Sequence, residues 1–265
     1  MDLRLTFNSD APSYDKLRPT YTAQLFEDVI SFANLTADKR ALEIGIGTGQ
    51  ATLPFLQTNC TLTAIELGAN LAAFVGQKYA GYPNFDVINQ DFESVPLNEN
   101  AFDLIYSASA FHWIAPEVGL PKVTRLLKPG GVFAWISNQP SPAPEHAHIY
   151  DAFQRFYMKH PQFFGDKPQQ SDPAYWQNIA KTKLDHRASL FREYGFTHAT
   201  HATYYGSRTF TAVEYAQLIS TYSTHKSMPA DLLATFLHEI AEVIDANGGQ
   251  FTLRDIVLLS MARKA

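Results

Sequence analysis

Residues 40–50, RALEIGIGTGQ, decide the fold that we expect for this chain. A short apolar run is followed at once by three glycines, Gly45, Gly47 and Gly49. Glycine allows a tight turn and the close approach of a ligand to the backbone. The stretch therefore predicts a first β-strand whose carboxyl end holds a nucleotide-like cofactor. A dinucleotide-binding turn requires glycine at the sixth place, where this chain has Gln50, so pyrophosphate binding is disfavoured.

Short apolar runs alternate with stretches of helical period on the carboxyl side of this turn, a pattern typical of βαβ units and a parallel sheet. The expected strands are Ala41–Ile44, Leu62–Ile65, Phe85–Ile88, Phe102–Ser107 and Val132–Ile136. Residues 139–144, QPSPAP, then predict a turn that cannot continue a central strand. A strand at His198–Phe210, a helical pair and a last strand at Phe251–Met261 predict that the sheet ends with an antiparallel pair.

We accordingly expect one domain over residues 1–265. Its parts are an N-terminal helical lid (1–39), a cofactor-binding core (40–138), a helical cap insertion (139–197) and terminal strands with a helical pair (198–265). The cap and the helical pair are expected above the carboxyl edge of the sheet, where open α/β sheets bind their ligands.

Composition narrows the class of protein. The 265 residues are 46% hydrophobic and 18% charged, which fits a folded globular chain. A net charge of −5 argues against nucleic acid and anionic membranes as partners and favours a small-molecule substrate. The single cysteine, Cys60, and the absence of a signal-like start predict a cytoplasmic protein. Among the nine histidines only His146/His148 and His198/His201 are closely spaced, and neither pair has a cysteine or carboxylate set nearby, so no metal is expected. The oligomeric state stays undetermined.

Two acidic positions lie at the ends of expected strands. Glu66 ends the second strand, where a carboxylate can accept hydrogen bonds from both hydroxyls of a ribose; the alternative is a charge at a helix N-terminus. Asp91 and Phe92 follow the third strand and offer an acceptor for an exocyclic amine and a ring for a purine face. Their alternative is a loop acid beside a core aromatic.

Taken together, these motifs resemble those of class I S-adenosylmethionine-dependent methyltransferases. The motifs are Leu42–Gly49, Glu66, Asp91–Phe92 and Leu127–Gly131. Tyr14–Tyr21, Ser109–Trp113 and Ala174–Trp176 are similar to the trans-aconitate methyltransferase group of the type 11 methyltransferases. The resemblance implies a Rossmann-like seven-stranded α/β sheet with its last strand antiparallel, a helical substrate-cap insertion, and S-adenosyl-L-methionine as cofactor. Thr22 stands where the group often has proline, a mild departure.

The resemblance and the residue pattern together give the candidate site. The cofactor-binding candidates are Tyr14, Arg18, Glu43, Gly45, Gly47, Gly49, Glu66, Leu67, Asp91, Phe92 and Ser107. The substrate-binding candidates are His112, Trp113, Tyr175 and Trp176. His112 is also the candidate general base, because it follows the fourth strand where the methyl group is expected; a histidine stacked among aromatic residues is the alternative.

The expected reaction is methyl transfer to a small molecule, to a carboxylate or hydroxyl oxygen. A hydroxyl acceptor would use a base, and a carboxylate needs none. A small carboxylic acid would be held by Arg18 and by cations of the cap, whereas a quinone, phenol or other flat acceptor would suit its aromatic residues. The cations considered are Arg155, Lys159, Lys181, Lys183, Arg187, His225 and Lys226. A nicotinamide-dependent oxidoreductase and a catalytically silent cofactor-binding scaffold are the competing interpretations.

Overall fold

The computed structural model describes residues 4, 15, 19–166 and 169–265. Their strands form one seven-stranded sheet in the order β3-β2-β1-β4-β5-β7-β6. The strands are β1 Arg40–Ile44, β2 Thr61–Glu66, β3 Phe85–Asn89, β4 Phe102–Ala108, β5 Leu127–Pro142, β6 Phe196–Thr211 and β7 Gln250–Lys264. The first five are parallel, and β7 is antiparallel to both β5 and β6. The predicted α/β fold with an antiparallel last strand is confirmed.

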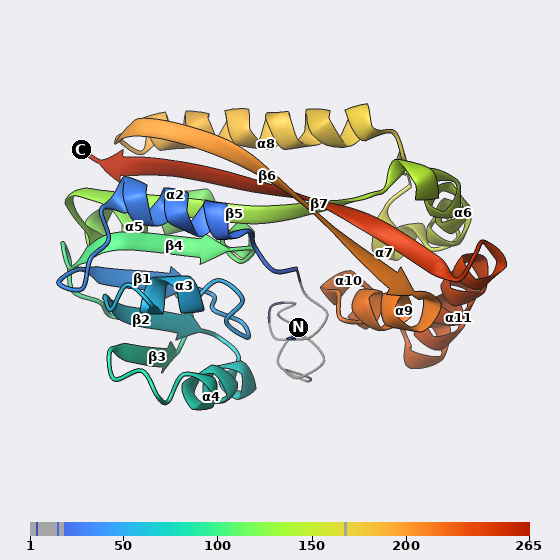
Figure 1. Ribbon diagram of the computed structural model, residues 1–265, viewed down its shortest axis with the longest axis horizontal. Coiled ribbons are helices and arrows are strands. Elements are labelled where there is room, and N and C mark those ends of the chain that lie inside the picture. The colour runs from blue at the N-terminus through green and yellow to red at the C-terminus, as the bar shows by residue number, and fades with distance from the viewer. Residues whose placement is uncertain (1–3, 5–14, 16–18, 167–168) are drawn as a thin grey trace.

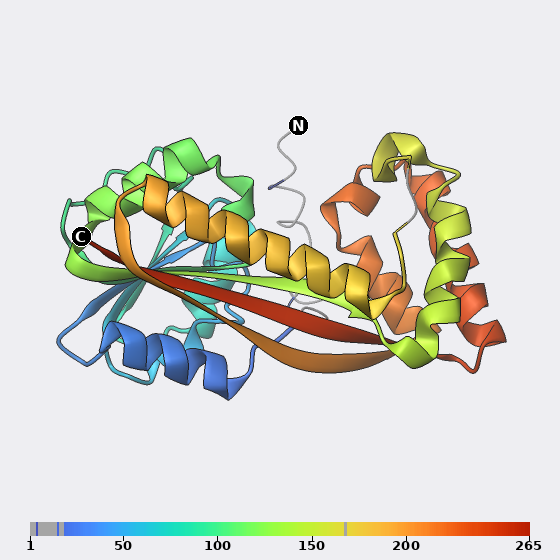
Figure 2. The same cartoon turned by 90° about the horizontal axis from the view of Figure 1, so that it is seen from above.

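The helices of residues 19–166 and 169–265 fall into three groups (Figures 1 and 2). α2 Ala23–Ala33, α3 Leu53–Leu56 and α4 Ala69–Lys78 pack on one face of the sheet. α5 Pro116–Leu126 and α8 Pro173–Glu193 cover the other face. The remaining helices gather beyond the carboxyl ends of β1 to β4, and we call them the cap lobe: α6 Ala147–Tyr157, α7 Pro161–Phe164, α9 Ala212–Ser220, α10 Ser223–Lys226 and α11 Ala230–Ala246. Short 3-10 turns lie at η2 Phe111–Trp113 and η3 Pro144–His146.

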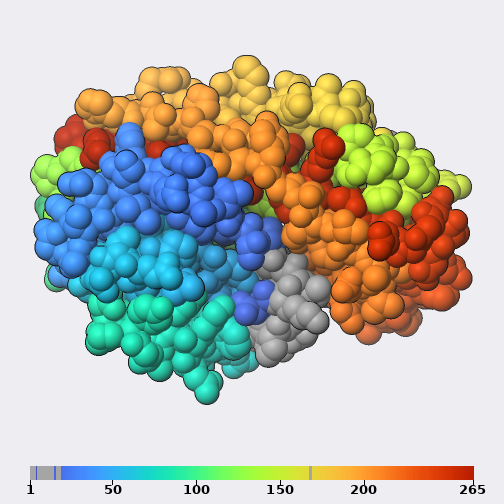
Figure 3. Space-filling model, in the orientation of Figure 1, coloured from blue at the N-terminus to red at the C-terminus, as the bar shows by residue number. Residues whose placement is uncertain are grey.

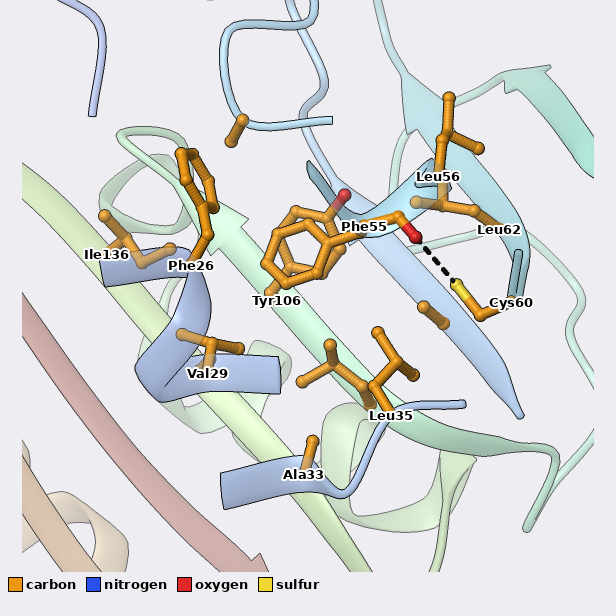
Figure 4. Close-up of a cluster of buried hydrophobic side chains, with 14 of the residues drawn as sticks. Phe26, Val29, Ala33, Leu35, Phe55, Leu56, Cys60, Leu62, Tyr106 and Ile136 are labelled. Carbon is orange, nitrogen blue, oxygen red and sulfur yellow. Dashed lines mark hydrogen bonds between the residues drawn. The ribbon is translucent and has the colours of Figure 1, made fainter. Parts of the chain in front are cut away.

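The core beneath α2 is built from rings and aliphatic side chains (Figure 4). The ring centroids of Phe55 and Tyr106 are 4.2 Å apart, and Phe26 meets Phe55 edge-on at 5.6 Å. Cys60 is fully buried there; its thiol donates to the Phe55 carbonyl over 3.5 Å, and burial raises the pKa of the thiol. Thr22 accepts a hydrogen bond from the backbone N–H of Leu25 and so caps α2.

The turn predicted at residues 139–144 is wrong. β5 continues through these residues and pairs with β7 up to Pro142 and Leu253. Its pairing with β4 ends at Ala108 and Ile136, so beyond that point one edge of β5 has no neighbouring strand. Pro140 and Pro142 lie two residues apart, so their nitrogens point to the same edge of the strand. Proline without an N–H is tolerated at such an open edge, and the strand continues.

Helix α8 differs in place from the predicted cap. Its first half puts Trp176 and Ala180 into the apolar core of the cap lobe. Its second half puts Leu190 and Phe191 against the sheet, beside Phe133. Figure 2 shows α8 running along β5, β6 and β7 from one lobe to the other. The helix therefore joins the lobes instead of covering the carboxyl edge of the sheet.

Candidate active site

A cavity of about 430 Å³ lies at the carboxyl ends of β1, β2 and β4 and extends along β5 to α10 of the cap lobe. Figure 3, in the orientation of Figure 1, shows the blue-to-teal residues of β1 to β3 and their helices on one side, and the orange and red segments of the cap lobe on the other. Pockets for small organic ligands occupy about 300–1,000 Å³. The cavity is therefore large enough for a cofactor or substrate, and its two halves differ in chemistry.

Gly45 and Gly47 form the turn after β1 and line the first half of the cavity. The backbone of Gly45 has a φ of +69°, and a Cβ there would lie 2.4 Å from the Cβ of Ala110. Glycine is therefore required both by the backbone conformation and by the close approach of the loop that follows β4. This packing brings the ends of β1 and β4 together at one point of the cavity wall.

Glu66, at the end of β2, ties two loops together. Its Oε2 accepts a hydrogen bond from the N–H of Gly47, and its Oε1 accepts one from the N–H of Gly68, both over 2.9 Å. Gly68 is the N-cap of α4, so the carboxylate also lies at a helix N-terminus. Burial raises the pKa of Glu66, and the backbone N–H donors oppose that shift. Because each carboxylate oxygen accepts about two hydrogen bonds, Glu66 keeps acceptor capacity toward the cavity that it lines together with Leu67.

Asp91 and Phe92, which follow β3, have different roles. The carboxylate of Asp91 accepts from the N–H of Ser94 over 2.8 Å and from its hydroxyl over 2.6 Å, which lowers the pKa of Asp91. Phe92 is buried, lines the cavity and has the Lys122 ammonium 5.2 Å from its ring centroid. The acid fixes its own loop, and the ring supplies an apolar surface to the cavity.

Glu43 lines the cavity from within β1. Its Oε2 accepts from the hydroxyls of Thr52 over 2.7 Å and Tyr106 over 2.8 Å. Burial of the carboxyl raises its pKa to about 7. Glu43 thus connects the aromatic core beneath α2 to the cavity.

The second half of the cavity is formed by the loop after β4 and by the extensions of β5 and β6. His112 and Trp113 lie in η2 with ring centroids 5.0 Å apart. Ser109 lies 3.1 Å from the hydroxyl of Tyr21, and its Oγ accepts from the N–H of Asn138 over 3.3 Å. The structure therefore brings His112 and Trp113 to the same cavity as Glu66.

The same half holds a polar cluster that the sequence pattern did not predict. Arg208 of β6 lines the cavity and donates two hydrogen bonds to Asp255 of β7, over 2.6 and 2.8 Å. Asn138 of β5 donates to the same carboxylate over 2.6 Å. The strand pairing that joins these residues is fixed by long-range register, and a sequence pattern carries no signal for it.

Other predicted site residues lie away from the cavity wall. Gly49 packs against Tyr79, whose hydroxyl donates to its carbonyl, and buried Ser107 donates to the Ile44 carbonyl over 2.8 Å. Tyr175 and Trp176 pack with the apolar core of the cap lobe. Tyr14 and Arg18 lie outside the described residues.

The cap cations considered from the sequence also lie elsewhere. Arg187 is buried beneath α8, stacked 4.5 Å over the Trp135 ring and donating to the Trp135 carbonyl. Lys181 forms an exposed ion pair with Asp185. Among residues 19–166 and 169–265, with Arg4 and Asp15, no group of three or more potential metal ligands occurs, and no helix is long and apolar enough to cross a membrane.

Comparison with known proteins gives one consistent family. The family described as "Methyltransferase domain" matches residues 42–135. An uncharacterized methyltransferase of Geobacillus kaustophilus is 30% identical over 203 residues, 72% of this chain and 87% of the relative. One of Mycobacterium bovis is 27% identical over 52% of this chain, and this chain spans only 54% of that relative's length.

Two further comparisons are with a relative that is named for its methyl acceptor and with a solved structure. A malonyl-[acyl-carrier protein] O-methyltransferase of Marinomonas is 27% identical over 55% of this chain and 59% of the relative. A solved structure of a proposed type II methyltransferase from Anaeromyxobacter dehalogenans superposes with a TM-score of 0.60 at 18% identity, over 93% of this chain and 98% of the other. At that identity the likeness shows a shared fold.

We expect Gly45→Ala to destabilise the protein by several kcal/mol. The substitution adds the cost of a left-handed backbone, about 1–2 kcal/mol, and an overpacked contact with Ala110, about 1–3 kcal/mol. Gly130→Ala is the matched control, because Gly130 has a φ of +73° with no atom within 4 Å of the added Cβ. Urea unfolding of the two variants measures the difference, and equal losses would contradict the close approach at Gly45.

Proposed function

This chain belongs to the class I S-adenosylmethionine-dependent methyltransferases, in the type 11 family, and on that premise we propose that it methylates an oxygen of a small-molecule acceptor. The observation that carries the proposal is the single cavity that joins Glu66 at the end of β2 to His112 after β4 and Arg208 on β6. A cofactor at one end and an acceptor at the other would meet in it.

The charges of the first half favour a cationic cofactor. Its described wall carries four carboxylates, Glu43, Glu66, Asp91 and Glu93. Arg4 also lines it and forms an ion pair with Glu93 over 2.7 Å. A cofactor with a sulfonium and an ammonium group is attracted to such a wall, whereas a pyrophosphate is repelled. The charges therefore agree with Gln50 at the sixth place of the glycine turn in disfavouring a dinucleotide.

Four of the described residues fit the parts of S-adenosylmethionine. Glu66 would accept from the ribose hydroxyls, and Phe92 would contact the adenine ring. The close-packed turn at Gly45 and Gly47 would admit the methionine portion beside the backbone. When bound, the cofactor would supply a methyl group on a positively charged sulfur; transfer would form a bond to the acceptor oxygen and leave the electron pair of the broken C–S bond on the sulfur.

The protein's own task is to align the acceptor and exclude water. A hydroxyl acceptor releases a proton, and His112 is placed in the cavity wall to accept it. A carboxylate acceptor becomes a neutral methyl ester and releases no proton. The relative named as a malonyl-[acyl-carrier protein] O-methyltransferase supports oxygen as the acceptor atom.

We expect Glu66→Ala to weaken binding of S-adenosylhomocysteine by about 2–4 kcal/mol, because two charge-assisted hydrogen bonds are lost and water compensates in part. Calorimetric titration measures the dissociation constant, and Glu99→Ala, at an exposed ion pair with Arg125, is the matched control. An unchanged constant would mean that Glu66 only carries the charge at the start of α4.

His112→Ala separates the two acceptor types. With a hydroxyl acceptor, we expect kcat to fall about 10²- to 10⁴-fold through loss of a general base. With a carboxylic acid acceptor, we expect a fall of less than about tenfold, since no proton is transferred. Steady-state kinetics with each acceptor class test this, with the exposed His238→Ala as control. A lowered melting temperature with unchanged turnover for both acceptor classes would contradict a catalytic role for His112.

A further inference from the structure

We propose that Arg208, held by Asp255, binds a carboxylate of the methyl acceptor, and that Asn138 accepts a hydrogen bond from a hydroxyl beside that carboxylate. The proposal rests on the proposed function and adds to it the recognition chemistry of the acceptor. It assigns the second half of the cavity to a hydroxy acid whose reacting oxygen lies toward His112.

The guanidinium of Arg208 is oriented before any ligand arrives. Its Nε and Nη2 atoms donate to the two carboxylate oxygens of Asp255, a bidentate fork at 2.6 and 2.8 Å. The Asp255 side chain is 5% exposed, and that of Arg208 is 20% exposed. Arg208 lines the cavity, and Asp255 does not. The pair therefore presents its cationic member to the ligand, with its rotamer already fixed.

Asn138 supplies a second and independent observation. Its Nδ2 donates to Asp255 Oδ1 over 2.6 Å, and because an ionised carboxylate only accepts, this bond sets which end of the amide is the oxygen. The Oδ1 atom is buried and has no hydrogen-bond partner, although Asn138 lines the cavity. A buried acceptor without a donor lowers stability, because its lost hydration is not replaced. A ligand hydroxyl next to the Arg208-bound carboxylate would satisfy it.

The surroundings favour an anion at this end. Among the residues that the structure describes, the neighbouring wall is made of neutral side chains, such as Pro140, Ser223 and Thr224. The carboxylates of the wall described here, Glu43, Glu66, Asp91 and Glu93, lie in the other half, so they repel an acidic acceptor toward Arg208.

The cluster is also rigidly mounted. Asn138, Asp255 and Arg208 come from three adjacent strands, and Asp255 pairs in register with Pro140 and Gly206. Sites built on strands hold their geometry more precisely than sites built on loops.

The experiment measures L-malate and succinate binding by calorimetry, with and without S-adenosylhomocysteine, in the full chain. These two diacids differ only by one hydroxyl. We expect the wild type to bind malate more tightly than succinate, and Arg208→Gln to weaken malate binding about 10- to 100-fold. Arg208→Lys, which keeps the charge without the fork, should lie in between. Asn138→Ala should make malate and succinate equal.

Arg254→Gln is the matched control, because it removes the same charge from the exposed residue next to Asp255, and it should bind malate as the wild type does. Equal malate affinity in the wild type and Arg208→Gln would overturn the proposal. So would a wild type that binds neither diacid but methylates neutral phenols, while the proposed function would stand. Loss of S-adenosylhomocysteine binding in every Arg208 variant would show that Arg208 maintains the fold of the cavity, and would also overturn the proposal. A wild type that binds malate but no S-adenosylhomocysteine would reject the proposed function alone, since the anion site is measured without cofactor.

Discussion

Strand β5 pairs with β7 from Val132 to Pro142, and the rest of the molecule depends on this ladder. Only its first part lies beside β4; the remainder carries the sheet past the carboxyl ends of β1 to β4. β6 pairs with β7 over its whole length, and α8 packs on the face of the sheet opposite α2. The cap lobe is therefore attached through continuous strands. One consequence is that the wall opposite the Gly45 turn is itself part of the sheet.

This arrangement places opposite charges at the two ends of one cavity. Glu43 and Glu66 are buried at the ends of parallel strands, and burial raises the pKa of each carboxyl. Buried acids of this kind reduce stability unless hydrogen bonds compensate, and here Thr52, Tyr106, Gly47 and Gly68 donate to them. Arg208 stands at the other end with its own carboxylate partner. The polarity suits a cationic cofactor beside an anionic acceptor.

The local sequence was sufficient to predict the site residues that directly follow a strand. The glycine turn, Glu66 and Asp91–Phe92 each follow a short apolar strand, so their common position at the sheet edge could be predicted before the structure. Features that depend on the pairing of strands far apart in the sequence could not be predicted in this way. Residues 139–144 look like a turn until the open edge of β5 is known. Arg208 pairs with Leu253, and its side chain reaches Asp255 only because the register of β6 against β7 brings the two side chains together. Tyr175 and Trp176 resemble pocket residues but fill the apolar core of the cap lobe.

Hydrogen–deuterium exchange with saturating S-adenosylhomocysteine tests most directly whether the first half of the cavity, at the ends of β1 and β2, holds the cofactor. The N–H groups of Gly47 and Gly68, which meet at Glu66, are the central reporters. We expect slower exchange in peptides covering residues 44–51, 66–72 and 90–95, with residues 196–205 of β6 unchanged. Unchanged exchange at all three segments, or protection confined to the cap lobe, would contradict this placement of the cofactor.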